Sequence, residues 1–437
     1  MNDSEAAAAL AAWVERLDTL DPTRIKLGLA RPRAVLARME LSPPPFRVAT
    51  IGGTNGKGST VAYLAAFLRR AGLGPVGAYT SPHLLDYRER IVIDGRMIAA
   101  ADLVAAFEAV EQARGETPLT YFEFGTLAAL EAFRRTAVRW AVLEVGLGGR
   151  LDAVNALDAE AAAVVSIGLD HQQWLGSDRD SIGREKAGIF RADRAAIVGD
   201  RDPPAGLLEV AAERGADVWL IGRDFDATKE GSGWRYRGRS LERSPLPLPA
   251  MPGRLQCDDA AVALALFEAV AAERLPGPAD LAAVLGSTQL PARIEVRHGE
   301  IEWVLDVAHN PQAAAALGEW LARAEPRKTV AVFGMLADKD AAAVAAALAP
   351  RIERWFLAPL GGRRGQSATA LADKTAAAIR DPVLCENMVQ AVAAAAQAAR
   401  GGERIVVFGS FHALEEALAS GLIPENSEPA DGSSRYA

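Results

Sequence analysis

The sequence predicts an α/β protein made of two domains, and three observations lead to this prediction. Its 437 residues exceed what one ordinary hydrophobic core accommodates. Short apolar runs alternate with Ala- and Leu-rich helical stretches, as in a mostly parallel sheet with helices on both faces. A stretch containing Gly, Ser, Thr and Pro, at 285–297, separates a first set of predicted strands from a second.

The order of apolar and polar segments places the elements in both halves. Apolar runs predict strands, helical periodicity predicts helices, and a polar, Gly- and Arg-rich segment predicts a hairpin or excursion. In the first half these are strands at 46–51, 139–145 and 162–168, helices at 101–115 and 126–136, and the excursion at 225–250. In the second half we expect strands at 301–307, 328–334, 352–358 and 403–408, with Ala-rich helices between them.

The ends of the chain have different characters. The first 17 residues, MNDSEAAAALAAWVERL, predict an amphipathic helix rather than a signal peptide, because Glu15 and Arg16 interrupt the apolar run. The polar, Pro- and Ser-rich residues 424–437 predict a disordered tail. We therefore expect domains at 1–292 and 297–423, followed by that tail.

Composition excludes several classes of protein. Half of the residues are apolar, 24% are charged and the net charge is −8, which is typical of a soluble protein without the basic character that attracts nucleic acid. No stretch approaches the ~20 apolar residues of a membrane span. Cys257 and Cys385 form no disulfide framework or metal spacing, as expected for a cytoplasmic protein.

Residues 53–60, GTNGKGST, predict a phosphate-binding loop between a strand and a helix. The three glycines allow backbone N–H groups to approach phosphate oxygens, and the helix N-terminus favours an anion. Lys57 supplies a positive charge for the terminal phosphates, and Ser59 and Thr60 supply hydroxyls for a phosphate or its Mg²⁺. A glycine between the lysine and the serine makes the loop a variant of the usual G-x-x-x-x-G-K-[ST] pattern.

Three more polar motifs follow apolar runs, so they should lie at the same carboxyl edge of the sheet, where ligands bind in open α/β folds. They span residues 79–91, 143–155 and 166–190. Ser81, Glu144 and Asp170 are candidate oxygen ligands for Mg²⁺, and a neutral histidine can take part. Four of the five histidines lie at predicted strand ends: His83, His171, His309 and His412.

No pattern of a covalent nucleophile is present, so the attacking groups should come from the substrates. The protein would then act by positioning and charge stabilisation.

Taken together, these motifs resemble the dihydrofolate synthase/folylpolyglutamate synthase family, a branch of the ATP-dependent Mur ligase superfamily. The resemblance runs from about residue 24 to residue 412 and rests on GTNGKGST, SPHL, RERI, LTYFEFGT, LEVGLGGRLDAVN, LDH, GREKAGI, DVAHNP and GSFH, in this order. It implies a P-loop ATPase domain joined to a smaller Rossmann-like C-terminal α/β domain.

The resemblance also implies a role for particular residues. Nucleotide contacts would come from Thr54, Asn55, Gly56, Lys57, Gly58, Ser59, Thr60, Asp259, Arg293 and Asp306. Metal contacts would come from Ser81, Glu144, His171 and Lys186, the last carried as a carbamate. Catalytic positions would be Lys57, Lys186 and His309. The pterin substrate would be held by Ile25, Lys26, Leu27, Thr120, Tyr121, Phe122, Glu123 and Asp152.

Two positions depart from the family pattern. Asp259 stands where the family often has an asparagine that contacts the nucleotide, and a carboxylate can accept from an adenine amino group but cannot donate. Ala292 stands where the family often has a glycine before the linker arginine.

The implied reaction joins L-glutamate to dihydropteroate and to reduced folates, with ATP as co-substrate and two Mg²⁺ ions, in a monomer. A folylpolyglutamate synthase without the dihydropteroate activity is one alternative. A Mur-type cell-wall ligase is another, although only 52 residues precede Gly53, too few for the extra domain of those enzymes. A P-loop switch protein would lack part of the catalytic set, which is complete here.

Some of these residues also have purely structural interpretations. Residues 88–90 can form a solvated charged turn, and Asp306 can be the N-cap of the next helix. Lys186 can form a salt bridge with Glu185 or Asp180. Tyr121 and Phe122 can be plain core aromatics or can stack on a pterin ring.

Overall fold

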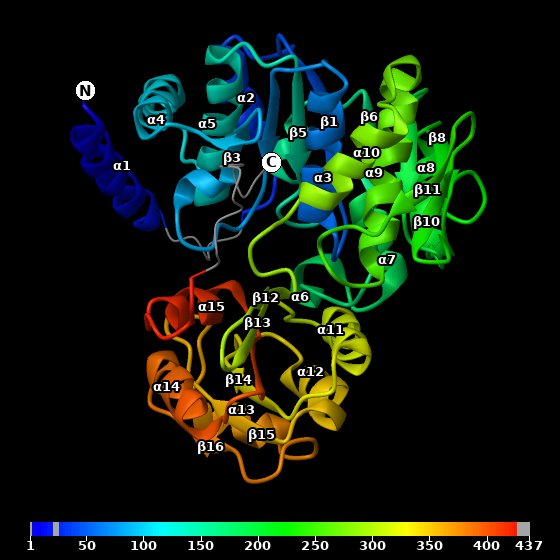
Figure 1. Cartoon of the computed structure of the whole chain (residues 1–437). Coiled ribbons are helices and arrows are strands. Elements are labelled where there is room, and N and C mark those ends of the chain that lie inside the picture. Colours follow the sequence, from blue (N-terminus) through cyan, green and yellow to red (C-terminus); the bar gives the residue numbers. More distant parts are fainter. Residues whose placement is uncertain (1, 21–25, 426–437) are drawn as a thin grey trace. The chain divides into compact units, whose positions relative to one another are not determined.

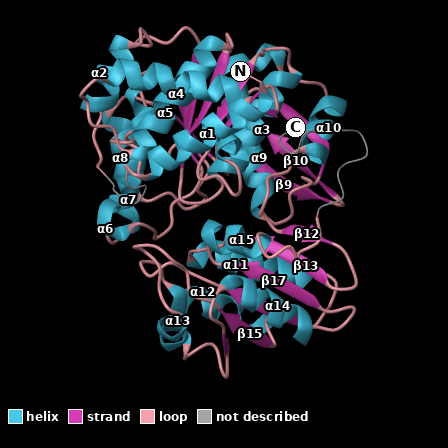
Figure 2. Ribbon diagram, turned by 90° about the vertical axis from the view of Figure 1, so that its left-hand side faces the viewer, coloured by secondary structure: helices cyan, strands magenta, loops and turns pink. Residues whose placement is uncertain are grey.

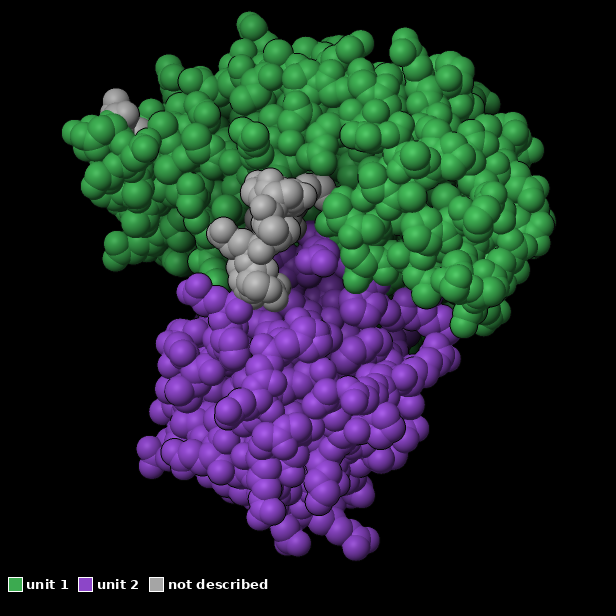
Figure 3. Space-filling model, viewed as in Figure 1, with its two compact units in different colours: residues 1–250, 256–288, 434–437 green, residues 251–255, 289–433 purple. Residues whose placement is uncertain are grey.

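The computed structural model describes residues 2–20 and 26–425. These residues form two compact units, coloured separately in Figure 3. Unit 1 comprises the described residues up to 250 together with 256–288, and unit 2 comprises 251–255 and 289–425. Our proposed domain limits remain 1–292 and 297–423. Most of the predicted tail, 426–437, lies outside the described residues.

Unit 1 contains an eight-stranded sheet with the order β4-β3-β2-β5-β1-β6-β7-β8 (Figure 1). Its strands are β1 Arg47–Gly52, β2 Val76–Tyr79, β3 Ile91–Ile93, β4 Arg96–Met97, β5 Trp140–Glu144, β6 Ala161–Val164, β7 Ala195–Val198 and β8 Asp217–Leu220. From β2 to β8 every pairing is parallel, and β3 and β4 add an antiparallel edge. The prediction of a mostly parallel sheet in an α/β fold is therefore confirmed, with the predicted strands observed as β1, β5 and β6.

Helices cover both faces of this sheet, as the ribbon in Figure 2 shows. They are α1 Asp3–Asp18, α2 Ala30–Arg38, α3 Lys57–Arg70, α4 Ala100–Arg114, α5 Tyr121–Arg135, α6 Gln172–Leu175, α7 Arg179–Ala187, α8 Ala205–Glu213, α9 Leu255–Ala271 and α10 Pro278–Ser287, with 3₁₀ turns η1 Tyr87–Arg90, η2 Ala153–Ala156 and η3 Ala272–Arg274. One face shares an apolar core with α1, α2, α4, α5, α7 and α8. Helix α3 packs on β1, β2 and β5 and contacts α10.

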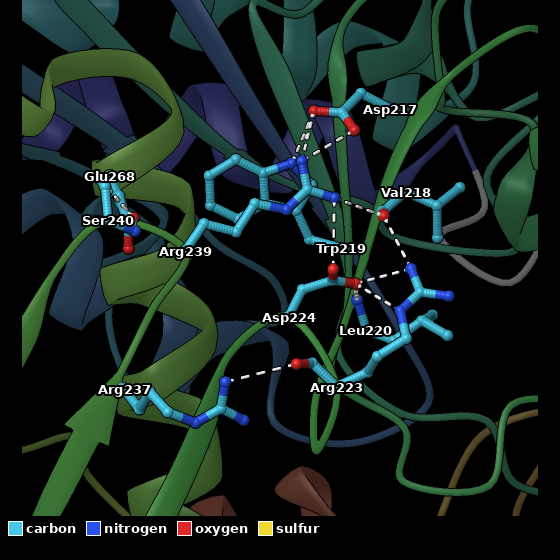
Figure 4. Close-up of polar contacts among 10 residues, drawn as sticks. All are labelled: Asp217, Val218, Trp219, Leu220, Arg223, Asp224, Arg237, Arg239, Ser240 and Glu268. Atoms are coloured by element: carbon cyan, nitrogen blue, oxygen red, sulfur yellow. Dashed lines mark hydrogen bonds and ion pairs between the residues drawn. The ribbon is translucent and has the colours of Figure 1, made fainter.

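The predicted excursion at 225–250 is a three-stranded antiparallel sheet of β9 Asp226–Glu230, β10 Gly233–Arg237 and β11 Glu242–Pro247. Buried Glu268 of α9 accepts hydrogen bonds from the Tyr236 hydroxyl (2.9 Å) and the Ser240 hydroxyl (2.8 Å). Next to it, Arg239 stacks on Trp219 of the edge strand β8 and donates to a backbone carbonyl of that strand (Figure 4). These contacts join the small sheet to α9 and cover the exposed edge of the large one.

Unit 2 contains a six-stranded sheet with the order β12-β13-β17-β14-β15-β16, parallel except for β12. Its strands are β12 Glu295–Arg297, β13 Glu302–Asp306, β14 Thr329–Phe333, β15 Arg354–Leu357, β16 Val383–Leu384 and β17 Arg404–Phe408. Its helices are α11 Pro311–Arg323, α12 Ala341–Leu348, α13 Ala368–Thr375, α14 Met388–Ala398 and α15 Phe411–Leu418, with the 3₁₀ turn η4 Ala349–Arg351. Part of the stretch at 285–297 is thus regular structure, because it completes α10 and forms β12.

Strand register brings the polar motifs of unit 1 to one edge. Ile51 of β1 pairs with Glu144 of β5, and Gly52 pairs with Val164 of β6. The phosphate loop and the motifs after β2, β5 and β6 therefore begin at the same carboxyl edge, as predicted. None of the described helices is long and apolar enough to cross a membrane.

Candidate active site

The phosphate loop connects β1 to α3 and is held in shape by the segment that follows β6. The Thr54 amide donates to the Ser166 carbonyl (2.8 Å), and the Asn55 amide donates to the Ser166 hydroxyl (2.9 Å). The Gly168 amide donates to the Thr54 hydroxyl (3.0 Å). Two motifs that are far apart in the sequence therefore form one rigid surface at the start of α3.

Gly56 is the residue before α3 and has a backbone that only glycine adopts readily. Its φ is +83°, and a Cβ at this position would lie 2.4 Å from Oδ1 of Asp259 and 2.8 Å from a methyl group of Val165. The carboxylate of Asp259, one of the departures from the family pattern, is therefore packed directly against the predicted phosphate loop.

Helix α9 also contacts the first turn of α3 through Gln256. The Gln256 amide donates to the Ser59 hydroxyl (3.4 Å) and accepts from the Tyr63 hydroxyl (3.3 Å). Ser59 and Thr60 are buried, and Thr60 donates to the Asp259 carbonyl (3.5 Å). Sequence reasoning missed Gln256, although it precedes Asp259 by three residues and so lies on the same helix face.

Three predicted residues from different strand ends meet beside the loop. Nζ of Lys57 donates to the Thr54 carbonyl (3.2 Å) and lies 3.9 Å from Oε1 of Glu144. The other carboxylate oxygen of Glu144 accepts from the Ser81 amide (3.1 Å). Because Glu144 is only 5% exposed, its negative charge lies in a low-dielectric environment that strengthens its interaction with Lys57.

Lys186 is buried at the same edge, and its Nζ donates to the Gly53 carbonyl (2.8 Å). Burial, reinforced by a neighbouring lysine, lowers the pKa of Lys186 to about 7. The alternative of a salt bridge with Glu185 or Asp180 is wrong. Glu185 forms an ion pair with Arg150 (2.6 Å), and Asp180 accepts from a backbone N–H of α8 (2.7 Å).

His171 lies directly before α6 in a left-handed conformation, with φ +52°. Its amide donates to Oδ1 of Asp170 (2.8 Å), and its Nε2 lies 3.9 Å from Oδ2 of the same residue. Within the described part of the chain, no three His, Cys, Asp or Glu side chains are grouped closely enough to hold a metal by themselves. The set of metal ligands predicted from the sequence differs from such a group, since it includes the hydroxyl of Ser81 and the amine of Lys186.

Of the residues predicted to bind the pterin, those that the structure describes gather near the start of α5. Ile25 lies outside the described residues. Arg31 donates to the Lys26 carbonyl (2.6 Å) and to Oε1 of Glu123 (2.7 Å), which joins the segment containing Lys26 and Leu27 to α5. Arg31 was not predicted, and the only signal was a charge in the apolar stretch IKLGLAR.

The residues in the first turn of α5 differ in whether they have structural roles or keep exposed surface for a ligand. Thr120 and Glu123 form a capping box, with hydrogen bonds of 3.3 and 2.8 Å. Tyr121 is 7% exposed and belongs to the core. Phe122 is only partly buried, and its ring packs against Gly146. Of the two aromatic residues, Phe122 is therefore the one that retains an accessible surface.

Asp152 is buried beside this region and accepts two backbone hydrogen bonds. They come from the amides of Leu147 (2.8 Å) and Val154 (3.0 Å). Burial raises the pKa of the Asp152 carboxyl to about 7, although these hydrogen bonds oppose the shift. The side chain therefore shapes the loop after β5 and starts η2, whatever else it binds.

The interpretation of residues 88–90 as a solvated turn is wrong. Arg90 is 7% exposed, stacks on Tyr87 and Tyr121, and donates to Nδ1 of His83 (2.7 Å). Glu89 accepts from the backbone amide of Leu84 (2.7 Å). These charges stabilise the loop after β2 from inside.

In unit 2, Asp306 at the end of β13 is buried and accepts hydrogen bonds from the amides of Ile294 (2.9 Å) and Ala308 (2.7 Å). Burial raises the pKa of Asp306, and the positive charge of Arg293 opposes this effect. Asp306 is not the N-cap of α11, because Asn310 occupies that position.

Arg293 and His309 lie in the same region of unit 2. The Arg293 guanidinium is 5.4 Å from the centre of the Phe411 ring. Nδ1 of His309 lies 2.8 Å from the Val307 carbonyl, an acceptor, so Nδ1–H donates to it. Three predicted residues, Arg293, Asp306 and His309, thus occur together at the carboxyl edge of the second sheet.

Comparison with known proteins agrees with this geometry. Residues 292–411 match the family model of the Mur ligase glutamate ligase domain. The dihydrofolate synthase/folylpolyglutamate synthase of Escherichia coli K12 is 40% identical over 95% of this chain and 96% of its own length. The solved structure of Escherichia coli FolC with DHPP and ADP has a TM-score of 0.88 at 39% identity and covers 95% of this chain and 98% of its own.

A second solved structure is the bifunctional folylpolyglutamate synthase/dihydrofolate synthase with Mn, AMPPNP and L-glutamate bound. Its TM-score is 0.86 at 41% identity, and it covers 94% of this chain and 97% of its own. The fold, the phosphate loop and the matched glutamate ligase domain define an ATP-dependent ligase of the Mur type. Within that class, the chain belongs to the dihydrofolate synthase/folylpolyglutamate synthase family.

Proposed function

We propose that this protein uses ATP to activate the carboxylate of dihydropteroate, or of a reduced folate, and joins it to the amino group of L-glutamate. The observation that carries the proposal is the group formed by Lys57, Glu144 and Ser81 beside the phosphate loop. It occurs in a chain whose relatives carry both activities in their names.

The reaction has two steps. A carboxylate oxygen of the substrate attacks the γ-phosphorus of ATP, and the bond from that phosphorus to the β-phosphate oxygen breaks. ADP is released, and the substrate becomes an acyl phosphate. The glutamate amine then attacks the acyl carbon, loses a proton, and the tetrahedral intermediate expels phosphate as the amide forms. Both steps need oriented reactants and stabilised charge rather than a protein nucleophile.

Nucleotide binding is assigned to both units. In unit 1, the loop from Thr54 to Thr60 would surround the phosphates, with Lys57 as the cation and Asp259 beside it. In unit 2, Arg293 and Asp306 would contact the nucleotide, and His309 would take part in the reaction. The buried hydrogen bonds of Asp306 support this assignment, since they fix the carboxylate in one orientation.

A divalent cation fits the donor set at the carboxyl edge of unit 1. The hydroxyl of Ser81, the carboxylate of Glu144 and the imidazole of His171 are oxygen and nitrogen ligands that suit Mg²⁺ or Mn²⁺. Such an ion would neutralise phosphate charge during transfer. We propose two Mg²⁺ ions, with Lys186 contributing to the second as a carbamate. The lowered pKa of Lys186 supports this, since only a neutral amine reacts with CO₂.

Substrate recognition is assigned to the region around the start of α5. The partly exposed ring of Phe122 can stack on a pterin, and we assign Ile25, Lys26, Leu27 and Asp152 to the same substrate. We assign Thr120, Tyr121 and Glu123 to the same substrate; Thr120 and Glu123 also cap the helix that carries Phe122. We further propose that the protein is a monomer and that it lies in the cytoplasm. The two free cysteines support the cytoplasmic location.

Phosphate release tests the proposal directly. Purified protein should release phosphate from ATP with dihydropteroate plus L-glutamate, and separately with tetrahydrofolate plus L-glutamate, but not when either partner is omitted. Lys57→Ala provides the matched negative control. If dihydropteroate is inert while folates react, the protein is a folylpolyglutamate synthase alone. If neither dihydropteroate nor tetrahydrofolate supports phosphate release, the assignment to folate ligation is overturned.

A further inference from the structure

The turn that precedes β12 has an unusual backbone on both sides of Arg293. Ala292 has φ +58° and Ile294 has φ +50°. L-residues rarely adopt this left-handed conformation, and a β-branched residue such as isoleucine does so least readily. Strain of this kind persists only where the surrounding structure enforces it, and it concentrates at functional sites.

Two carboxylates enforce the conformation, one on each side. Oδ2 of Asp306 accepts from the Ile294 amide (2.9 Å), and Oε2 of Glu295 accepts from the Ala292 amide (2.9 Å). The Ala292 carbonyl also accepts from the Val307 amide (3.2 Å). Ala292 is fully buried and Ile294 is 7% exposed in the core of unit 2. The backbone of Arg293 is therefore fixed at both ends.

Glu295 is itself held by a charged partner. Its other carboxylate oxygen accepts from Nε of Arg297 (2.8 Å), and Nη2 of Arg297 is also 2.8 Å away. Nη1 of Arg297 donates to the Pro424 carbonyl (2.8 Å), and the Arg297 side chain is only 8% exposed. A carboxylate restrained in this way keeps its acceptor oxygen at the Ala292 amide.

We propose that Glu295 is a positioning residue for Arg293, and this inference rests on the nucleotide role proposed for Arg293 above. By holding Ala292 in the left-handed conformation, Glu295 directs the guanidinium toward Phe411 and Asp306 at the carboxyl edge of the unit 2 sheet. Asp306 provides the equivalent restraint on the other side but is also a proposed binding residue. Glu295 is therefore the restraint that can be removed without removing a nucleotide contact.

The test is a set of variants of the full chain, titrated with AMPPNP and Mg²⁺ by calorimetry. Without the restraint, the turn should leave the left-handed conformation, and Glu295→Ala should weaken AMPPNP affinity about tenfold. Arg293→Ala should weaken it at least as much, and Glu295→Ala should add nothing in the Arg293→Ala background. Ala292→Gly should restore most of the affinity lost in Glu295→Ala, because glycine adopts positive φ without strain.

Glu302→Gln is the matched control. Glu302 is another buried carboxylate of the same sheet and pairs with Arg404 (2.6 Å). This variant should lower the melting temperature and leave AMPPNP affinity unchanged. The proposal is overturned if Glu295→Ala behaves like this control, if its effect adds to that of Arg293→Ala, or if Arg293→Ala leaves affinity unchanged. Phosphate release by the wild-type protein is measured separately and tests the proposed function. If the wild-type protein releases no phosphate, the proposed function is wrong, but the AMPPNP affinities of the variants still decide whether Glu295 positions Arg293.

Discussion

The phosphate loop after β1 and the turn before β12 achieve left-handed backbone in opposite ways. The phosphate loop has glycine at its positions of positive φ, with φ +150° at Gly53 and +83° at Gly56. The turn before β12 places alanine and isoleucine there, at Ala292 and Ile294, and holds them with carboxylates. The first loop therefore depends on the absence of side chains, whereas the second depends on the presence of particular ones.

The largest effect should come from the charge carried by the glycine loop. Lys57→Ala should lower the rate of phosphate release by ~10²–10³, because an electrostatic group that stabilises developing charge is lost. Phosphate release at saturating ATP and glutamate measures it, with a melting curve to check the fold. The exposed lysine variant Lys328→Ala should retain wild-type turnover. Near wild-type turnover in a folded Lys57→Ala protein would remove the phosphate-loop assignment.

The glycine itself should matter next. Gly56→Ala introduces a Cβ that would lie 2.4 Å from Asp259 at a positive φ, so we expect AMPPNP affinity to fall by a factor on the order of 10–10². Gly286→Ala in α10 is the matched control, because nothing lies within 4 Å of its Cβ. That variant should be neutral or slightly stabilising. Equal affinities in the two variants would show that the loop tolerates side chains.

This contrast explains what the sequence could predict. Glycines around a lysine, between a strand and a helix, form a local pattern, so the phosphate loop and the strands β1, β5 and β6 were predictable. The restraints on Arg293 were not, because Glu295 and Asp306 act through backbone amides and nothing in their spacing indicates a positive φ. Gln256 and Arg31 were missed for a similar reason, since each acts on a segment distant in the sequence.

Structural roles of polar residues were also hard to predict. The sequence left open whether Asp306 caps a helix, and the structure gives that role to Asn310 instead. Glu123 remains a proposed substrate contact, and it also belongs to a capping box and to an ion pair with Arg31. A polar residue at a strand end can bind a ligand or support the loop, and only three-dimensional contacts separate the two.

Lys186 should make activity depend on both pH and bicarbonate. Its pKa of about 7 means that the amine is mostly neutral above pH 7 and protonated below, and only the neutral form can become a carbamate. In buffer equilibrated with air, which fixes dissolved CO₂, we expect activity at pH 6 to be about tenfold lower than at pH 8, since only about one-tenth of the amine is neutral at pH 6.

Added bicarbonate should restore part of that activity in the wild-type protein and none in Lys186→Met. A mass increase of the intact protein, lost on acidification and absent from the variant, would identify the carbamate. A bicarbonate response that persists in Lys186→Met would assign the effect to another group.

The pterin side of unit 1 should give a smaller and selective effect. Phe122→Ala should lower kcat/KM for dihydropteroate by roughly tenfold, because a stacking surface is lost, and should affect tetrahydrofolate less. Asp152→Ala should show the same preference, together with a loss of stability from its two backbone hydrogen bonds. Asp340→Ala removes a helix-capping aspartate in unit 2 and should reduce stability alone. Equal losses for both substrates would place the pterin pocket elsewhere.

The smallest effect should come from Ala292→Gly, which replaces the strained alanine by the residue that the phosphate loop uses. Glycine removes a conformational cost of about 1–2 kcal/mol at positive φ. The substitution also removes a buried methyl group, which costs about 0.8 kcal/mol of stability. It raises the backbone entropy of the unfolded chain, which costs about 0.5–1 kcal/mol more. These terms nearly cancel, so the free energy of unfolding and the AMPPNP affinity should both stay close to wild-type values as long as Glu295 is present. Denaturant unfolding and calorimetry measure the two quantities. A large loss of affinity in Ala292→Gly alone would mean that the alanine side chain, rather than its backbone conformation, positions Arg293, and the contrast between the two loops would then no longer hold.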